Sequence, residues 1–119
     1  MKALLDEIMS CIKHELERAA MKFGMTNHSD HESYAILAEE LEEAIAEAKA
    51  AGKELDNFWD LVKCNGSDAA KLNSLKTLER CASLAACEFT QVAAMARKAA
   101  LTVGDRTVFI DLVKEGEGR

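Results

Sequence analysis

Proline is absent from the 119-residue chain, and aromatic residues make up only 5% of it. The absence of proline excludes a proline-rich linker. Alanine, glutamate, lysine and leucine are abundant instead, and these residues favour helices over strands. The composition therefore predicts an all-α protein, and the length fits one domain and leaves no room for two.

The sequence also lacks a long apolar run and an excess of basic residues. No stretch approaches the roughly 18 apolar residues of a membrane span, and acids interrupt the N-terminus at Asp6 and Glu7, unlike a signal peptide. Lys and Arg number 15 against 21 Asp and Glu, which gives a net charge of −6 and argues against sequence-independent nucleic-acid binding. We therefore expect a cytoplasmic protein with neither nucleic acid nor a membrane as a partner.

None of the four cysteines belongs to a C-x-x-C pair. We interpret them as small buried apolar residues in a reducing compartment. Disulfides or a metal site are the alternatives. The four are Cys11, Cys64, Cys81 and Cys87.

Helical periodicity divides residues 1–103 into a predicted bundle of three to four helices. The first covers about 2–23 and stops at Gly24. The motif Ser29-Asp30-His31-Glu32 has the form of a capping box and starts a second helix, which we expect to end at Gly52. A short amphipathic helix over 53–63 follows. After the turn at Asn65-Gly66, a long helix runs from Ser67 or Asp68 to about Leu101.

Residues 104–119 differ from the rest, because 107–113 are rich in residues that favour strands and 115–119 resemble a frayed tail. A lone strand cannot satisfy its backbone hydrogen bonds without a partner. This segment is therefore an arm that pairs with another chain, an arm that packs in an extended form, or a helix despite its composition.

Acidic residues gather on two of the predicted helices. Glu40, Glu43 and Glu47 share one face of the second helix, where their charges repel one another unless water or a divalent cation compensates. Glu88 falls inside the apolar stripe of the last helix, where a carboxylate needs a metal or an ion pair. The basic residues that offer such a pair from another helix are Lys13, Arg18 and Lys22.

Two of these segments together resemble the MazG-like nucleoside triphosphate pyrophosphohydrolases, in particular the short phage and prophage members. The first is Glu39-Glu40-Leu41-Glu42-Glu43, which fits E-E-x-x-E and follows Tyr34-Ala35-Ile36-Leu37-Ala38 on the capped helix. The second is Ala86-Cys87-Glu88-Phe89-Thr90-Gln91-Val92-Ala93-Ala94-Met95-Ala96. The resemblance covers about residues 30–100.

The resemblance implies an all-α bundle that binds Mg²⁺, with Mn²⁺ as a possible substitute, and hydrolyses a (d)NTP to a (d)NMP and pyrophosphate. The metal ligands would be Glu40 and Glu43 from one motif and Glu88 and Gln91 from the other, with the three glutamates also catalytic. Gln91 departs from the family pattern, which has an aspartate there. Candidate substrate-binding residues are Glu39, Lys98 and Trp59.

Each candidate role has an alternative. Trp59 fits the core as well as a nucleotide pocket, and His28 and His31 fit a helix cap as well as a ligand role. Because Gln91 is neutral, the alternative function is a weak or inactive MazG-like module that binds nucleotides or partners. The last long helix is apolar nearly all round, so we expect a second subunit to cover it, in a homodimer or tetramer.

Overall fold

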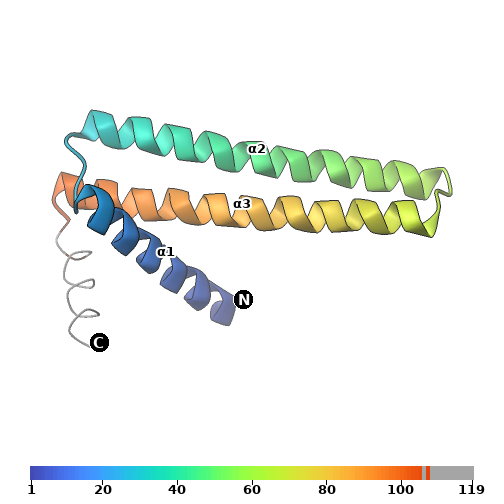
Figure 1. The fold of residues 1–119 in the computed structure, drawn as a ribbon, viewed down its shortest axis with the longest axis horizontal. Coiled ribbons are helices and arrows are strands. Elements are labelled where there is room, and N and C mark those ends of the chain that lie inside the picture. Colours follow the sequence, from blue (N-terminus) through green and yellow to red (C-terminus); the bar gives the residue numbers. More distant parts are fainter. Residues whose placement is uncertain (106, 108–119) are drawn as a thin grey trace. The chain divides into compact units, whose positions relative to one another are not determined.

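The computed structural model describes residues 1–105 and residue 107. Within this part of the chain, three α-helices follow one another: α1 (Lys2–Phe23), α2 (Asp30–Lys63) and α3 (Asp68–Val103) (Figure 1). The described residues contain no strand, so the predicted all-α class is confirmed. None of the three helices combines the length and the apolar character that a bilayer crossing requires. The β-rich segment 107–113 lies, apart from Thr107, outside the described residues.

The ends of the helices are set by the local signals that predict them. Gly24 follows α1 with a positive φ of 92°, and its N–H donates to the Ala20 carbonyl oxygen at 2.8 Å. The Ser29 hydroxyl oxygen accepts the N–H of Glu32 at 3.1 Å at the start of α2. Ser67 caps α3 in the same way, because its hydroxyl accepts the N–H of Ala70 at 3.1 Å. These three boundaries confirm the sequence predictions.

The predicted helix end at Gly52 is wrong, as is the separate short helix over 53–63. Helix α2 continues through Gly52 for 34 residues and ends at Lys63. One glycine costs a helix only about 1 kcal/mol relative to alanine, and the residues on both sides favour helix. Contacts beyond Gly52 hold the second half in place, since Glu54 and Asn57 both bond to Ser74 on α3.

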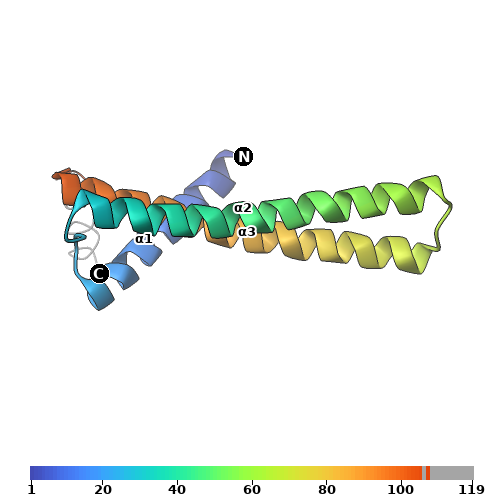
Figure 2. The same cartoon turned by 90° about the horizontal axis from the view of Figure 1, so that it is seen from above.

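The chain divides into two compact units. The hairpin unit comprises residues 41–89, where the second part of α2 and the first part of α3 run antiparallel on either side of a short loop (Figures 1 and 2). The Ser74 hydroxyl, 1% exposed, donates to Glu54 Oε1 at 2.8 Å, and Asn57 Nδ2 donates to Ser74 Oγ at 3.2 Å. This partly buried polar network, centred on the buried Ser74, favours one alignment of the two helices, because a shift of either would leave its groups unpaired.

The three-helix unit comprises residues 1–40 and the described residues from 90 onward. Its core joins Ile12 and Leu16 of α1 to Ala94 of α3, with Ala93 and Met95 packed against them. Leu16 is 1% exposed and Ala94 is fully buried. Alanine at the contact lets α1 approach α3 closely, as small residues do between helices.

The cysteines differ from the expectation that they are buried. All four are free thiols, but Cys11, Cys64 and Cys87 are exposed and Cys81 is half-buried. Their places on the helices explain this, because the cores of a two-helix hairpin and a three-helix unit are too narrow to cover every apolar position.

Gly52 lies in the interior of α2, where alanine should stabilise the helix relative to glycine. A Cβ at Gly52 would meet no atom within 4 Å, and Gly52 is not among the residues with positive φ. We expect Gly52→Ala to raise the free energy of unfolding by about 0.5–1 kcal/mol in urea denaturation.

The matched control for this prediction is Gly66→Ala. A Cβ at Gly66 would lie 2.9 Å from Leu61 Cδ2, so this variant should lose stability. A loss of stability in Gly52→Ala would contradict a helix that is continuous at this position.

Candidate functional site

A pocket of about 440 Å³ lies within the three-helix unit. All three helices and the loop between α1 and α2 contribute to its walls. Its apolar lining is Ala19, Phe23, Ile36 and Met95. Its polar lining is Thr26, Asn27, His28, Glu32, Glu39, Glu40, Gln91 and Lys98. The volume and the mixed lining suit a small organic ligand with polar groups.

Predicted site carboxylates lie close together in the hairpin unit and next to it along α2. Glu40 and Glu43 stand one turn apart on α2, and a carboxylate oxygen of each lies within 4.8 Å of the other. The same limit holds between Glu43 and Glu88, both of which belong to the hairpin unit. Glu40 and Glu88 are half-buried and Glu43 is exposed. Like charges this close repel one another, and a divalent cation with oxygen ligands would relieve the repulsion.

The alternative for Glu88, an ion pair with a basic residue, is not found in the described part of the chain. Arg18 pairs with Glu15 one turn away on α1, and the Lys22 ammonium lies 5.2 Å from the centre of the Phe23 ring. Among the described residues, no ion pair involves Glu43 or Glu88. Glu88 is therefore a half-buried carboxylate with no ion-pair partner among the described residues.

Gln91 is fixed by a contact that the sequence does not reveal. Its Nε2 donates a hydrogen bond of 2.7 Å to Glu15 Oε2 on α1. Glu15 in turn pairs with Arg18. The amide nitrogen is held this way, and Gln91 also lines the pocket. An aspartate at this position could not donate to Glu15.

Lys98 lies where its position on the helix predicts, in the wall of the pocket. The residue is only 4% exposed, and its Nζ lies 5.7 Å from the centre of the Phe23 ring. A buried ammonium group needs an anion or an aromatic face to offset its desolvation. Lys98 is therefore placed to attract the negative charge of a ligand into the pocket.

The remaining predicted residues have mixed outcomes. Glu39 lines the pocket, as its proposed role requires. Trp59 is not part of that lining. It belongs to the hairpin unit, is 57% exposed and lies under the Lys63 ammonium, 5.7 Å from the ring centre. The alternative that places Trp59 in the core is wrong, and its role toward a nucleotide stays a prediction.

The two histidines lie at the start of α2, as expected for residues near a helix cap. His28 Nδ1 lies 3.0 Å from Glu32 Oε2. The side-chain carboxylate of Glu32 therefore contacts His28, and the backbone N–H of Glu32 donates to the Ser29 hydroxyl. His28 also lines the pocket, whereas His31 is an exposed residue of the first turn.

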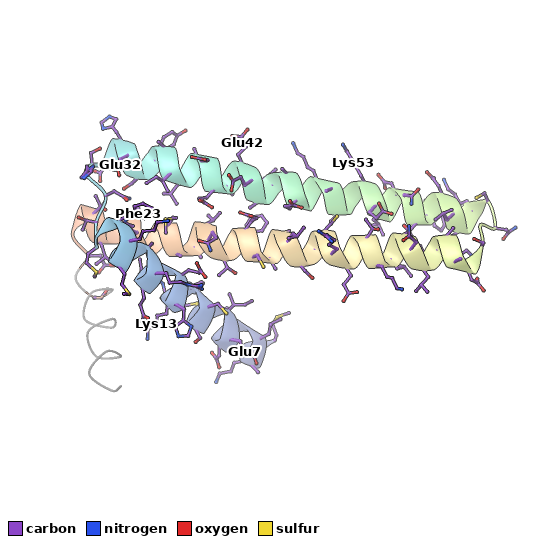
Figure 3. All side chains as sticks on the ribbon, in the orientation of Figure 1. Glu7, Lys13, Phe23, Glu32, Glu42 and Lys53 are labelled. Atoms are coloured by element: carbon purple, nitrogen blue, oxygen red, sulfur yellow. The ribbon has the colours of Figure 1, made fainter. Side chains whose placement is uncertain are left out.

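Sequence reasoning missed three residues that shape the pocket: Phe23, Asn27 and Glu15. Phe23 and Asn27 line the pocket directly, and Glu15 orients Gln91. Figure 3 shows Phe23 at the end of α1, next to the loop that carries Asn27. The only sequence feature that pointed to these residues was Gly24, because a glycine at a helix end allows a turn that brings the residues on its two sides together.

Comparison with models of known families, with curated proteins and with solved structures found no match to this chain.

The Gln91–Glu15 bond predicts the effect of restoring an aspartate at position 91. Gln91→Asp removes the donor and sets two carboxylates side by side, so we expect a loss of about 1–2 kcal/mol in the free energy of unfolding of the metal-free protein. The double variant Glu15→Gln, Gln91→Asp reverses donor and acceptor and should recover most of that loss. Urea denaturation of the four proteins measures the coupling, and additive effects would contradict the bond.

Proposed function

We propose that the chain is a Mg²⁺-dependent nucleoside triphosphate pyrophosphohydrolase of the MazG-like type. The observation that carries this proposal is the pair of carboxylates at Glu43 and Glu88 within the hairpin unit, whose oxygens lie within 4.8 Å of each other. Among the described residues neither has an ion-pair partner, and Glu40 stands one turn before Glu43 on α2. Glu40 also lines the pocket of the three-helix unit, whose mixed lining suits a small organic ligand with polar groups.

The donor set suits a hard cation. Carboxylate and amide oxygens are the ligands that Mg²⁺ and Mn²⁺ take in proteins. Glu40, Glu43 and Glu88 would supply the carboxylates, and the carbonyl oxygen of Gln91 is an additional donor. Bound Mg²⁺ would supply charge neutralisation at the phosphates and a lower pKa for the attacking water.

The protein's own groups would act around that centre. Lys98 would attract the phosphates through its buried ammonium group, and Glu39 would contact the substrate from the rim of the pocket. A carboxylate of the cluster would accept the proton of the attacking water. Attack at the α-phosphorus breaks the α–β anhydride bond, so the products are a nucleoside monophosphate and pyrophosphate.

The alternative function is a MazG-like module that binds a nucleotide or a partner with little or no turnover. One observation favours it: the neutral Gln91 is committed to Glu15 through its amide nitrogen. A site with one carboxylate fewer than the family pattern holds less negative charge and would bind the cation more weakly.

Release of pyrophosphate from a panel of NTPs and dNTPs, with Mg²⁺ or Mn²⁺, separates the two functions. We expect release in the wild type and a fall of about 100-fold or more in Glu40→Gln, Glu43→Gln and Glu88→Gln, because charge stabilisation of the transition state is lost. The matched control is Glu42→Gln, since Glu42 is exposed and points away from α3 on the outer side of α2 (Figure 3).

The same variants test whether the cluster is a site or a structural ion pair. Without metal, Glu43→Gln and Glu88→Gln each remove like-charge repulsion, so stability should stay equal or rise by a few tenths of a kcal/mol. A large loss of stability in Glu88→Gln would instead identify a structural pair and would contradict the proposal. Absence of pyrophosphate release with every nucleotide would favour the alternative module.

We also propose that the chain assembles into a homodimer or a tetramer. Large apolar side chains on α1 and α3 remain uncovered in the single chain: Leu4 and Leu5 are each 53% exposed, and Leu72 is 54% exposed. A second copy would bury such faces with two-fold symmetry.

Light scattering at micromolar concentration tests the assembly. We expect at least twice the mass of one chain. Ala86→Glu, on an exposed and otherwise apolar side of α3, should lower the mass, whereas Ser83→Glu on the polar side should not. A monomeric mass for the wild type would contradict the proposal.

A further inference from the structure

One face of the hairpin unit is apolar and uncovered. The buried residues of this unit, Ala44 on α2 and Ser74 and Ala85 on α3, mark the sides on which the two helices face each other. In antiparallel helices, the residue that follows an inward-facing one lies on the same side of the pair in both helices. The residues that follow these three, and those in line with them along each helix, therefore share one surface.

We call this surface the hairpin face. On α2 it carries Leu41, Ile45, Leu55, Trp59 and Val62, with Ala48 and Gly52 completing the helical repeat. On α3 it carries Leu72, Leu75 and Phe89, with Glu79, Ala82 and Ala86 between them. The eight large apolar side chains are exposed by between 37% and 57%, and Leu84 is the one exposed large apolar residue of the hairpin unit that lies elsewhere. Their spacing of three and four residues is that of a stripe that packs against another helix.

Charged residues of alternating sign follow the outer edge of the stripe on α2. They recur every seven residues, as Glu42, Lys49, Asp56 and Lys63, and all four are exposed. Residues seven apart lie two turns, about 10 Å, apart along a helix, so these charges do not pair with one another in one chain. Within the described residues, Lys63 pairs with Asp60, and the other three take part in no ion pair.

The geometry points to a second copy of this chain as the occupant of the hairpin face, with its α2 antiparallel to the first. Antiparallel alignment sets Glu42 opposite Lys63 of the second copy, and Lys49 opposite its Asp56. Both pairings have the same midpoint, between positions 52 and 53, so one two-fold axis forms each of them twice. This inference rests on the proposed homodimer and assigns its face and its orientation.

Side-chain sizes fit the same alignment. Trp59 lies opposite the small Ala48 of the second copy, and Ile45 lies opposite Val62. Large side chains that face small ones interdigitate between packed helices. The alignment buries the Trp59 ring, which the single chain leaves exposed.

The charges of α3 agree with this axis independently. The bonds of Glu54 and Asn57 to Ser74 set residues 76–78 of α3 level with the midpoint on α2. An axis at that level places Glu79, the one charged residue of the hairpin face, opposite Lys76 of the second copy. This pairing follows from the contacts inside the hairpin and not from the charges of α2.

Exchange of the charges at positions 49 and 56 tests the inference, with the full chain in analytical ultracentrifugation. Lys49→Glu and Asp56→Lys each set like charges opposite one another, so we expect each to raise the Kd of the dimer about tenfold. The double variant restores opposite charges and should return the Kd to within about twofold of the wild type. The two positions are too far apart in one chain for this recovery to arise within it.

Two further variants complete this test. Lys53→Glu is the matched control, because Lys53 points away from α3 on the outer side of α2 (Figure 3), and it should leave the Kd unchanged. Ile45→Glu puts a charge into the apolar part of the hairpin face and should give the mass of one chain in light scattering. Its helical circular dichroism should match that of the wild type, because Ile45 is exposed in the single chain.

The distance between the two hairpin loops tests the orientation. Cys64 lies in the loop, and the other three cysteines can be replaced by serine. Spin labels on Cys64 should lie about 30 Å or more apart, because each loop is about eleven residues from the axis. A distance below about 20 Å would place both loops at one end and would overturn the antiparallel orientation.

The outcomes separate this inference from the proposed function. A monomeric wild type would reject both the homodimer and the hairpin face. A dimer whose Kd does not respond to Lys49→Glu and Asp56→Lys, or is not recovered in the double variant, would retain the homodimer and reject the hairpin face. Glu43 precedes the inward-facing Ala44 and so lies on the opposite side of the hairpin, which keeps the proposed cation site apart from the contact. A dimer that passes the charge exchange but releases no pyrophosphate would retain the hairpin face and reject the hydrolase.

Discussion

Repulsion between carboxylates is the constraint on which the functional account depends. Glu43 and Glu88 belong to different helices of the hairpin unit and hold their charges within 4.8 Å of each other, and Glu40 adds a third charge one turn away on α2. No ion pair of the described residues compensates Glu43 or Glu88, so that part of the chain brings these two charges together without a counter-charge. A cation that bridges the acids converts the repulsion into binding energy.

Contacts within each unit hold polar side chains in place. The partly buried network of Ser74, Glu54 and Asn57 aligns the helices of the hairpin unit, and the Glu15 carboxylate fixes the amide of Gln91 in the three-helix unit. Contacts that set side chains in place before a ligand arrives lower the entropy lost on binding. Lys98 is a group whose burial an anionic ligand would make less costly.

The sequence predicted those features that depend on neighbouring residues. The bounds of α1, the Ser29 cap and the start of α3 followed from local signals, and helical periodicity placed Glu40 and Glu43 on one face. The break at Gly52 was wrong because contacts of Glu54 and Asn57 with Ser74 join residues far apart in the sequence. The Glu15–Gln91 bond and the contact of Asn27 with Thr102 could not be predicted for the same reason, since each joins residues that lie far apart in the sequence.

Titration of the metal-free protein with Mg²⁺ or Mn²⁺ by calorimetry tests the central claim most directly. The account predicts saturable binding in the wild type, loss of that binding in Glu88→Gln, and retention of it in Glu42→Gln. Absence of binding in the wild type, or equal binding in Glu88→Gln, would contradict the claim that these carboxylates form a cation site.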